Sequence, residues 1–130
     1  MSRFLSILAL ALMLVFGIAS ARAATEAPFT AEAFAAAQKA GKPILVDVWA
    51  SWCPTCAKQA PILSKLSVDP AFKDLTIFRV DYDTQKDVVR DLGVRMQSTL
   101  IAFHGAKEAG RSAGETNPDR IRALLEQANR

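Results

Sequence analysis

The chain has 130 residues, 51% of them apolar and 22% charged, which favours one globular domain of ordinary composition. Two of its 16 Lys and Arg residues, Arg3 and Arg22, lie in an N-terminal segment that we expect to be removed. The remaining 14 face 13 acidic residues, for a net charge of +1. This balance, and the lack of a basic stripe interleaved with aromatic residues, excludes nucleic acid as an expected partner.

Residues 1–23 have the pattern of a cleavable signal peptide. Arg3 precedes an apolar stretch from Phe4 to Ile18, and Ala21-Arg22-Ala23 is a small-x-small cleavage pattern. The alternative is an uncleaved membrane anchor, since 18 uncharged residues reach the lower limit of a bilayer span. We expect an exported protein of the bacterial periplasm, an oxidising compartment, with residues 24–130 as its domain.

The first half of this domain alternates helices and strands. Thr30 is an N-cap residue, Glu32 suits the first helical turn, and Gly41 is a left-handed terminator. The pattern predicts, in order, a helix to Ala40, a strand Ile44–Trp49, a helix from Pro54 that Pro61 should kink, a strand Thr76–Asp81, and a helix from a capping box at Thr84–Asp87 to Gly93. Right-handed crossovers would make the two strands parallel neighbours.

The second half predicts a hairpin and a final helix. A strand Thr99–Phe103, a turn at 104–107 and an edge strand Glu108–Ser112 precede a helix capped by Asn117, which runs to Ala128. The predicted fold class is therefore α/β, with a mixed central sheet flanked by helices.

The only two cysteines, Cys53 and Cys56, follow the first strand directly. If Pro54 is the first helical residue, Cys53 is at the N-cap, and its thiolate can accept hydrogen bonds from the N–H groups of Thr55 and Cys56. Such an environment lowers a cysteine pKa from ~8.5 to roughly 3.5–7.5. Cys53 would attack a partner disulfide, and the less exposed Cys56 would resolve the mixed disulfide.

Two other uses of the cysteines are possible. A structural disulfide across two residues closes a very small loop and gains little entropy. A closed zinc site needs four ligands, whereas the chain has two thiols and one histidine, His104, which we expect to be a solvated turn residue. No metal ligand is therefore assigned.

Asp47 is a second chemical signal, because it interrupts an apolar strand six residues before Cys53. Burial would raise the pKa of its carboxyl and suit it to exchange protons with Cys56. The alternative is a structural carboxylate bonded to a lysine or serine. Trp49 and Trp52 are either core or rim aromatics or walls of the site.

Together these residues resemble the thioredoxin family along nearly the whole predicted domain. The segment from Val46 to Lys58 matches the family's signature, and Pro61 lies at its usual distance from the second cysteine. The resemblance implies a thioredoxin-like fold, with Cys53 as nucleophile, Cys56 as resolving cysteine and Asp47 as proton-handling acid. It also places the substrate-binding surface at Trp52, Pro54, Thr55, Gln97, Ser98 and Thr99.

The sequence departs from the family at two places. Pro54-Thr55 stands between the cysteines where thioredoxins have Gly-Pro, which leaves the direction of electron flow open. Ser98 stands where the family has a cis-proline, and since a non-proline cis bond costs ~2.5–4 kcal/mol, we expect Gln97–Ser98 to be trans. The lost proline also raises the hypothesis that two chains share a metal ion or iron–sulfur cluster.

The sequence therefore predicts a monomeric, exported thiol–disulfide oxidoreductase that reduces protein disulfides through Cys53 and Cys56. Its substrate would dock as an added strand on the backbone of residues 97–99. It needs no bound cofactor, since the sulfurs carry the electrons, and a membrane thiol carrier could reduce it again. The alternative is a binding module or metallochaperone that keeps the fold without turnover.

Overall fold

The computed structural model describes residues 20–130, so most of the predicted signal peptide, residues 1–19, lies outside the described residues. Five strands form one sheet in the order β1-β3-β2-β4-β5. The strands are β1 (Thr25–Pro28), β2 (Pro43–Trp49), β3 (Thr76–Asp81), β4 (Thr99–His104) and β5 (Lys107–Ala113). The helices are α1 (Ala31–Lys39), α2 (Pro54–Ser67), the 3-10 helix η1 (Pro70–Phe72), α3 (Lys86–Asp91) and α4 (Pro118–Ala128).

The sheet is mixed, as predicted. β2 pairs in parallel with β3, while β4 and β5 continue the sheet antiparallel on the other side of β2. The sequence pattern missed β1, which pairs in parallel with β3 at the edge. This strand has four residues, ends in a proline and is largely exposed, so it shows no alternation of apolar and polar residues.

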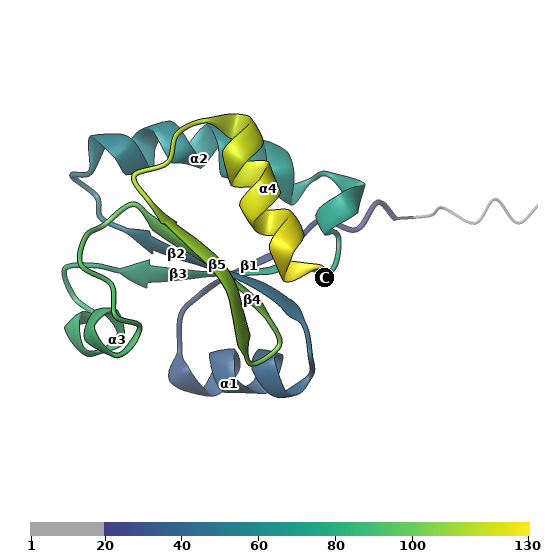
Figure 1. The fold of residues 1–130 in the computed structure, drawn as a ribbon, viewed down its shortest axis with the longest axis horizontal. Helices are drawn as coiled ribbons and strands as arrows, with labels where there is room; N and C mark the ends of the chain where they lie inside the picture. The colour runs from purple at the N-terminus through teal and green to yellow at the C-terminus, as the bar shows by residue number, and fades with distance from the viewer. Residues whose placement is uncertain (1–19) are drawn as a thin grey trace, which may run out of the picture.

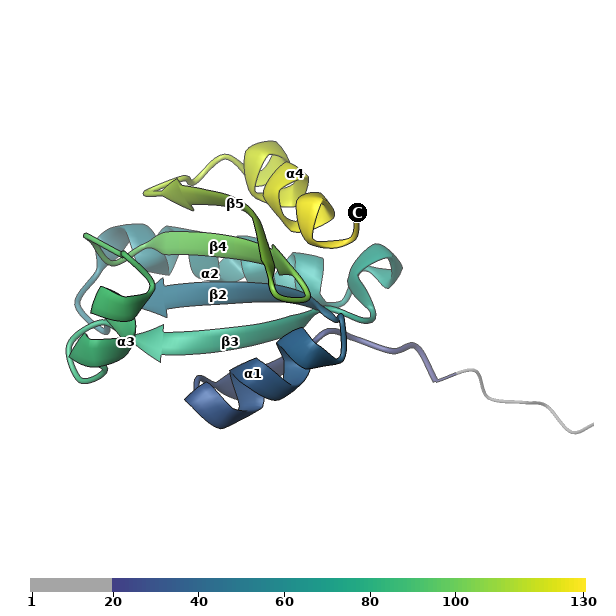
Figure 2. The ribbon, with the colours of Figure 1, turned by 60° about the horizontal axis from the view of Figure 1, so that its bottom comes forward.

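Helices cover both faces of the sheet (Figures 1 and 2). Alternate residues of β2 supply the two cores, because side chains of a strand point to opposite faces. Ile44, Val46 and Val48 pack in the core with residues of α1 and α3. Leu45 packs in the core with residues of α2 and α4, and Asp47 lies on the same face of the strand. The carboxyl of Asp47 therefore lies beneath α2.

Local capping rules hold at three of the four α-helices. Thr30, Cys53 and Asn117 are N-caps that accept backbone hydrogen bonds, and Gly41 has a positive φ after α1. The capping box at Thr84 was wrong, since α3 begins only at Lys86 without a side-chain cap. The carboxylate of Asp81 instead accepts the N–H groups of residues 83 and 84, which places them in the turn.

His104 was expected to be a solvated turn residue, and this was wrong in part. It is exposed but ends β4, and its Nδ1 lies 2.9 Å from the carbonyl oxygen of Ala128 at the end of α4. Between residues 20 and 130, no helix combines the length and the apolar character that crossing a membrane requires.

Candidate active site

The cysteine turn, residues 50–56, connects the end of β2 to the start of α2. Cys53 and Cys56 form a disulfide, with their Cα atoms 5.2 Å apart. Cys53 is the N-cap of α2, and its Sγ accepts the N–H of Cys56 at 3.0 Å. The cap position was predicted correctly, although only one of the two expected N–H groups reaches the sulfur. Because this N–H has no partner within the helix, it favours negative charge on Cys53.

Both cysteines are buried, with 3% of each residue exposed. They pack with Ala50 and the half-buried Trp49 and Tyr82. The expectation that Cys53 is more exposed than Cys56 was therefore wrong for the disulfide form, since both joined sulfurs share this apolar cluster. Tyr82 follows β3 and was not recognised in the sequence as part of the site.

The rim of the site is formed by Trp52, Pro54 and Thr55. Trp52 is 56% exposed, and its Nε1 donates to the carboxylate of Asp83 at 2.7 Å. Pro54 is exposed and Thr55 is half-buried. The indole therefore lies on the surface beside the cysteines and does not belong to the core.

Asp47 is buried beneath α2 and pairs with Arg79 of β3, whose Nη2 lies 3.2 Å from Oδ2. Burial raises the pKa of the Asp47 carboxyl, while the guanidinium of Arg79 works in the opposite direction. Arg79 is 49% exposed and stacks over the ring of Trp49 at 5.2 Å, so solvent weakens its effect. The expected raised pKa is confirmed, and the partner is an arginine, not the lysine or serine of the alternative interpretation.

A half-open cavity of about 430 Å³ adjoins Asp47. Its walls include Ala60 and Ser64 of α2, Ile77 of β3 and Glu26 of β1. The cavity connects a buried carboxyl to the surface, so water can carry a proton to or from Asp47.

The substrate loop, residues 96–98, precedes β4 and lies against the end of β2, where Ser98 N–H donates to Val48 O at 2.8 Å. The Gln97–Ser98 bond is trans, as predicted, and residues 20–130 contain no cis peptide bond. Ser98 instead has a φ of 61°, and it is the only non-glycine residue in that range with a positive φ. Left-handed backbone is strained for a residue with a Cβ atom.

The buried backbone of Ser98 is already hydrogen-bonded within the protein. Its carbonyl accepts both Gly114 N–H at 2.9 Å and the side-chain amide of Gln59 at 3.1 Å. Thr99 is buried, and its hydroxyl donates to Met96 O. Within residues 20–130, Gln97 N–H has no hydrogen-bond partner. Gln97 therefore has a free backbone donor, whereas Ser98 N–H is taken by Val48.

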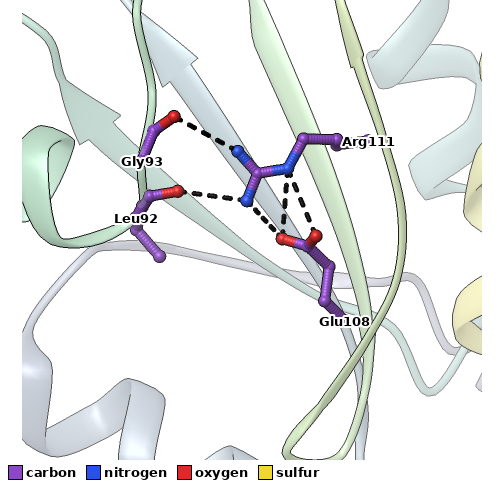
Figure 3. A network of polar contacts seen from close by, with 4 residues as sticks. All are labelled: Leu92, Gly93, Glu108 and Arg111. Carbon is purple, nitrogen blue, oxygen red and sulfur yellow. Dashed lines mark hydrogen bonds and ion pairs between the residues drawn. The ribbon is translucent and has the colours of Figure 1, made fainter.

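An arginine forms hydrogen bonds with the segment that leads into the substrate loop. Arg111 of β5 donates to the carbonyl groups of Leu92 and Gly93 at the end of α3, and it pairs with Glu108 (Figure 3). The guanidinium thereby neutralises the carbonyl end of a short helix. The loop is thus held from α2 at Ser98, and the segment before it is held from β5.

Sequence analysis missed Gln59 as well as Tyr82 and Asp83. The buried stripe of α2 contains Cys56, Gln59, Leu63 and Leu66. Had the helix been aligned on Cys56 and the two leucines, the polar Gln59 would have appeared on the buried side. A polar residue on the buried side of a helix was therefore the sequence signal for Gln59.

The described part of the protein lacks the ligands for a metal site within one chain. Residues 20–130 contain no cluster of three or more His, Cys, Asp or Glu side chains that could hold a metal ion. A shared site would need thiolates from two chains, and it stays a hypothesis.

Comparison with known proteins adds the decisive observation, since the thioredoxin family model matches residues 25–127. This chain belongs to the thioredoxin family. It is similar to the thioredoxin of Mycobacterium tuberculosis H37Rv, with 38% identity over 73 residues that cover 56% of this chain and 62% of that one. The thioredoxin of Alicyclobacillus acidocaldarius is 30% identical over 92 residues, which cover 71% and 87% of the two chains.

A solved structure shows the same fold. The crystal structure of Trxlp from Edwardsiella tarda EIB202 has a TM-score of 0.75 and 43% identity, and the match covers 78% of this chain and 98% of that one. The Cys53–Cys56 pair, with Pro54 between, occupies the thioredoxin active-site position. These similarities, together with the paired cysteines, support a protein-disulfide oxidoreductase.

Proposed function

We propose that this member of the thioredoxin family is an exported, monomeric reductase of protein disulfides, with Cys53 as nucleophile and Cys56 as resolving cysteine. One observation carries the proposal: Cys53 caps α2, and its sulfur receives the N–H of Cys56 at 3.0 Å. The same N–H can stabilise a thiolate when the disulfide is open. Cys53 is then the better attacking group of the pair.

The reaction consists of two exchanges. Cys53 thiolate attacks one sulfur of a substrate disulfide, which forms a mixed disulfide and releases the other substrate sulfur as a thiolate. Cys56 then loses its proton and attacks Cys53 Sγ, which forms the Cys53–Cys56 disulfide and releases the second thiolate. Two electrons pass to the substrate, whose thiolates take up protons, and the protein is left oxidised.

Asp47 is proposed to receive the proton of Cys56 in the second exchange. Its buried carboxyl has a raised pKa, which brings its proton affinity closer to that of a thiol. The cavity beside it offers water a path for passing that proton on. We assign Asp47 to proton transfer and Arg79 to holding its carboxylate in place.

A dithiol donor must return two electrons after each cycle, because an oxidising compartment does not reduce the pair. The leader-like residues 1–23 support export to the periplasm, and a membrane thiol carrier would then be the donor. Trp52, Pro54, Thr55 and the free backbone donor of Gln97 form the surface proposed to meet the substrate.

The test uses insulin, whose reduced chains precipitate, and the chain from residue 24. Cys53→Ser should abolish reduction, whereas Cys56→Ser should accumulate mixed disulfides that a non-reducing gel separates. Full activity of Cys53→Ser would refute the assignment. The reduction potential decides the direction, since a value near ~ −270 mV indicates a reductant and one near ~ −120 mV an oxidant.

A further inference from the structure

Gln59 is a polar residue in the core, with 1% of the residue exposed. It lies on α2 one turn after Cys56, on the buried stripe that also contains Leu63. Burying an amide costs free energy unless hydrogen bonds replace those to water. Its Oε1 is buried and has no hydrogen-bond partner among residues 20–130. The hydrogen bonds of its Nε2 must therefore offset the free-energy cost of burying the amide.

The amide nitrogen of Gln59 joins three segments of the chain. Nε2 donates to Ser98 O at 3.1 Å and to Glu115 O at 2.9 Å. Two carbonyl oxygens fix the orientation of the amide, because the reverse orientation would place Oε1 against two acceptors. A single side chain thus ties α2 to the substrate loop and to the segment before α4.

The bond to Ser98 stabilises a strained conformation. The φ of 61° at Ser98 is unfavourable for a serine, and nothing covalent enforces it. The carbonyl of Ser98 is held from two sides, by Gln59 and by Gly114 N–H, while its own N–H is held by Val48. Of these contacts, only Gln59 comes from the helix that carries the cysteines.

We propose that Gln59 is a positioning residue, whose amide holds the substrate loop in its left-handed conformation beside the cysteines so that Gln97 can receive a protein substrate. Only the kinetic consequence of this inference, weaker docking of a protein substrate when the amide is removed, rests on the proposed function. The amide contributes nothing to the exchange reaction itself, since it contacts neither sulfur in the hydrogen-bond network.

The first experiment separates substrate docking from thiol chemistry in Gln59→Met, which keeps the side-chain length and removes the donors. KM for insulin should rise about tenfold, the effect of losing one or two net hydrogen bonds, with kcat within about twofold of wild type. The rate with Ellman's reagent, a small disulfide that needs no added strand, should also stay within about twofold. Ser67→Ala, which removes another side-chain hydrogen bond of α2, one that is partly buried, is the control and should leave KM unchanged.

The second experiment tests the strain. Glycine adopts a positive φ without penalty, so Ser98→Gly in the Gln59→Met background should bring KM back to within about threefold of wild type. Amide exchange at Ser98 and Gly114 should accelerate about tenfold in Gln59→Met and slow again in the double variant. Gln59→Leu repeats the test if methionine repacks α2.

Three results would overturn the proposal: equal changes in KM, kcat and the Ellman rate, unchanged exchange at Ser98 and Gly114, or no recovery in the double variant. Absence of insulin reduction by the wild-type protein would count against the proposed function alone. In that case the exchange rates decide whether Gln59 holds the loop.

Discussion

The cysteine turn and the substrate loop lie on neighbouring segments, yet different kinds of interaction hold them. The cysteine turn is held by local bonds, with Cys53 N–H on Ala50 O and Cys56 N–H on Cys53 Sγ. The substrate loop is held by residues that are distant in sequence, since Gln59 and Gly114 both donate to Ser98 O from 39 and 16 positions away. A strand end and a helix start therefore suffice for the reactive group, whereas the docking surface depends on the assembled fold.

This difference predicts that substitutions at distant positions disturb the substrate loop more than the cysteine turn. Local hydrogen bonds form with the helix and survive substitutions elsewhere. Tertiary hydrogen bonds to a strained residue are lost together when any partner moves.

Substitution by valine should separate the two regions most strongly. Ser98→Val places a β-branched side chain at a φ of 61°, so we expect a loss of about 2–3 kcal/mol of unfolding free energy. Thr55→Val, in the first turn of α2, should cost about 0.5 kcal/mol or less, because both residues are β-branched and have similar helix propensities. Urea unfolding of the oxidised variants measures both, and equal losses would remove the distinction.

Asp47→Asn should raise the free energy of unfolding and lower the rate of disulfide reduction. The raised pKa means that the folded state holds its proton more tightly than the unfolded state, so stability falls as pH rises from the ordinary aspartate range through the raised pKa. At about pH 8 the variant should be more stable by about 1–3 kcal/mol, since no buried charge remains. The gain should vanish in acid, where Asp47 is protonated in both states.

The kinetic half of this prediction follows from the proposed proton transfer. Insulin reduction by Asp47→Asn should be slower by about tenfold or more, with the mixed disulfide accumulating. Stability measured by urea across the pH series, and turnover measured in parallel, check the two halves independently. A variant with wild-type turnover would assign Asp47 to structure only.

The smallest effects concern the helix caps, which are local like the cysteine turn. Asn117→Ala should cost about 1 kcal/mol, because its side chain accepts two N–H groups of α4. Thr84→Ala should stay within about 0.5 kcal/mol, since its predicted cap does not form. Thermal unfolding of the pair distinguishes a cap that exists from one that only the sequence spacing suggests.

Much of the fold was predictable because its signals are local. The apolar run of β2, the caps at Thr30 and Asn117, and the proline after Cys53 each act within a few residues. β1 was not predictable, since four exposed residues become a strand only through pairing with β3.

The same reasoning divides the site. Cys53, Cys56 and Asp47 stand out as residue types in an apolar or helix-starting context, and the direction of the Asp47 pKa followed from burial alone. Helical spacing could have placed Gln59 on the buried side of α2, but neither the left-handed Ser98 nor its contact with that amide was predictable from spacing. Their contact joins positions 59 and 98, which no short-range pattern connects.

The outer strand of the hairpin has a further consequence for the behaviour of the protein in concentrated solution. A strand at the edge of a sheet leaves backbone groups that another chain can pair with, which is a route to aggregation. β5 carries Lys107, Glu108 and Arg111, and the ladder between β4 and β5 is irregular near Phe103. At the opposite edge, β1 is short and ends in Pro28. Charge, irregular pairing and proline thus discourage edge-to-edge association between the sheets of two chains.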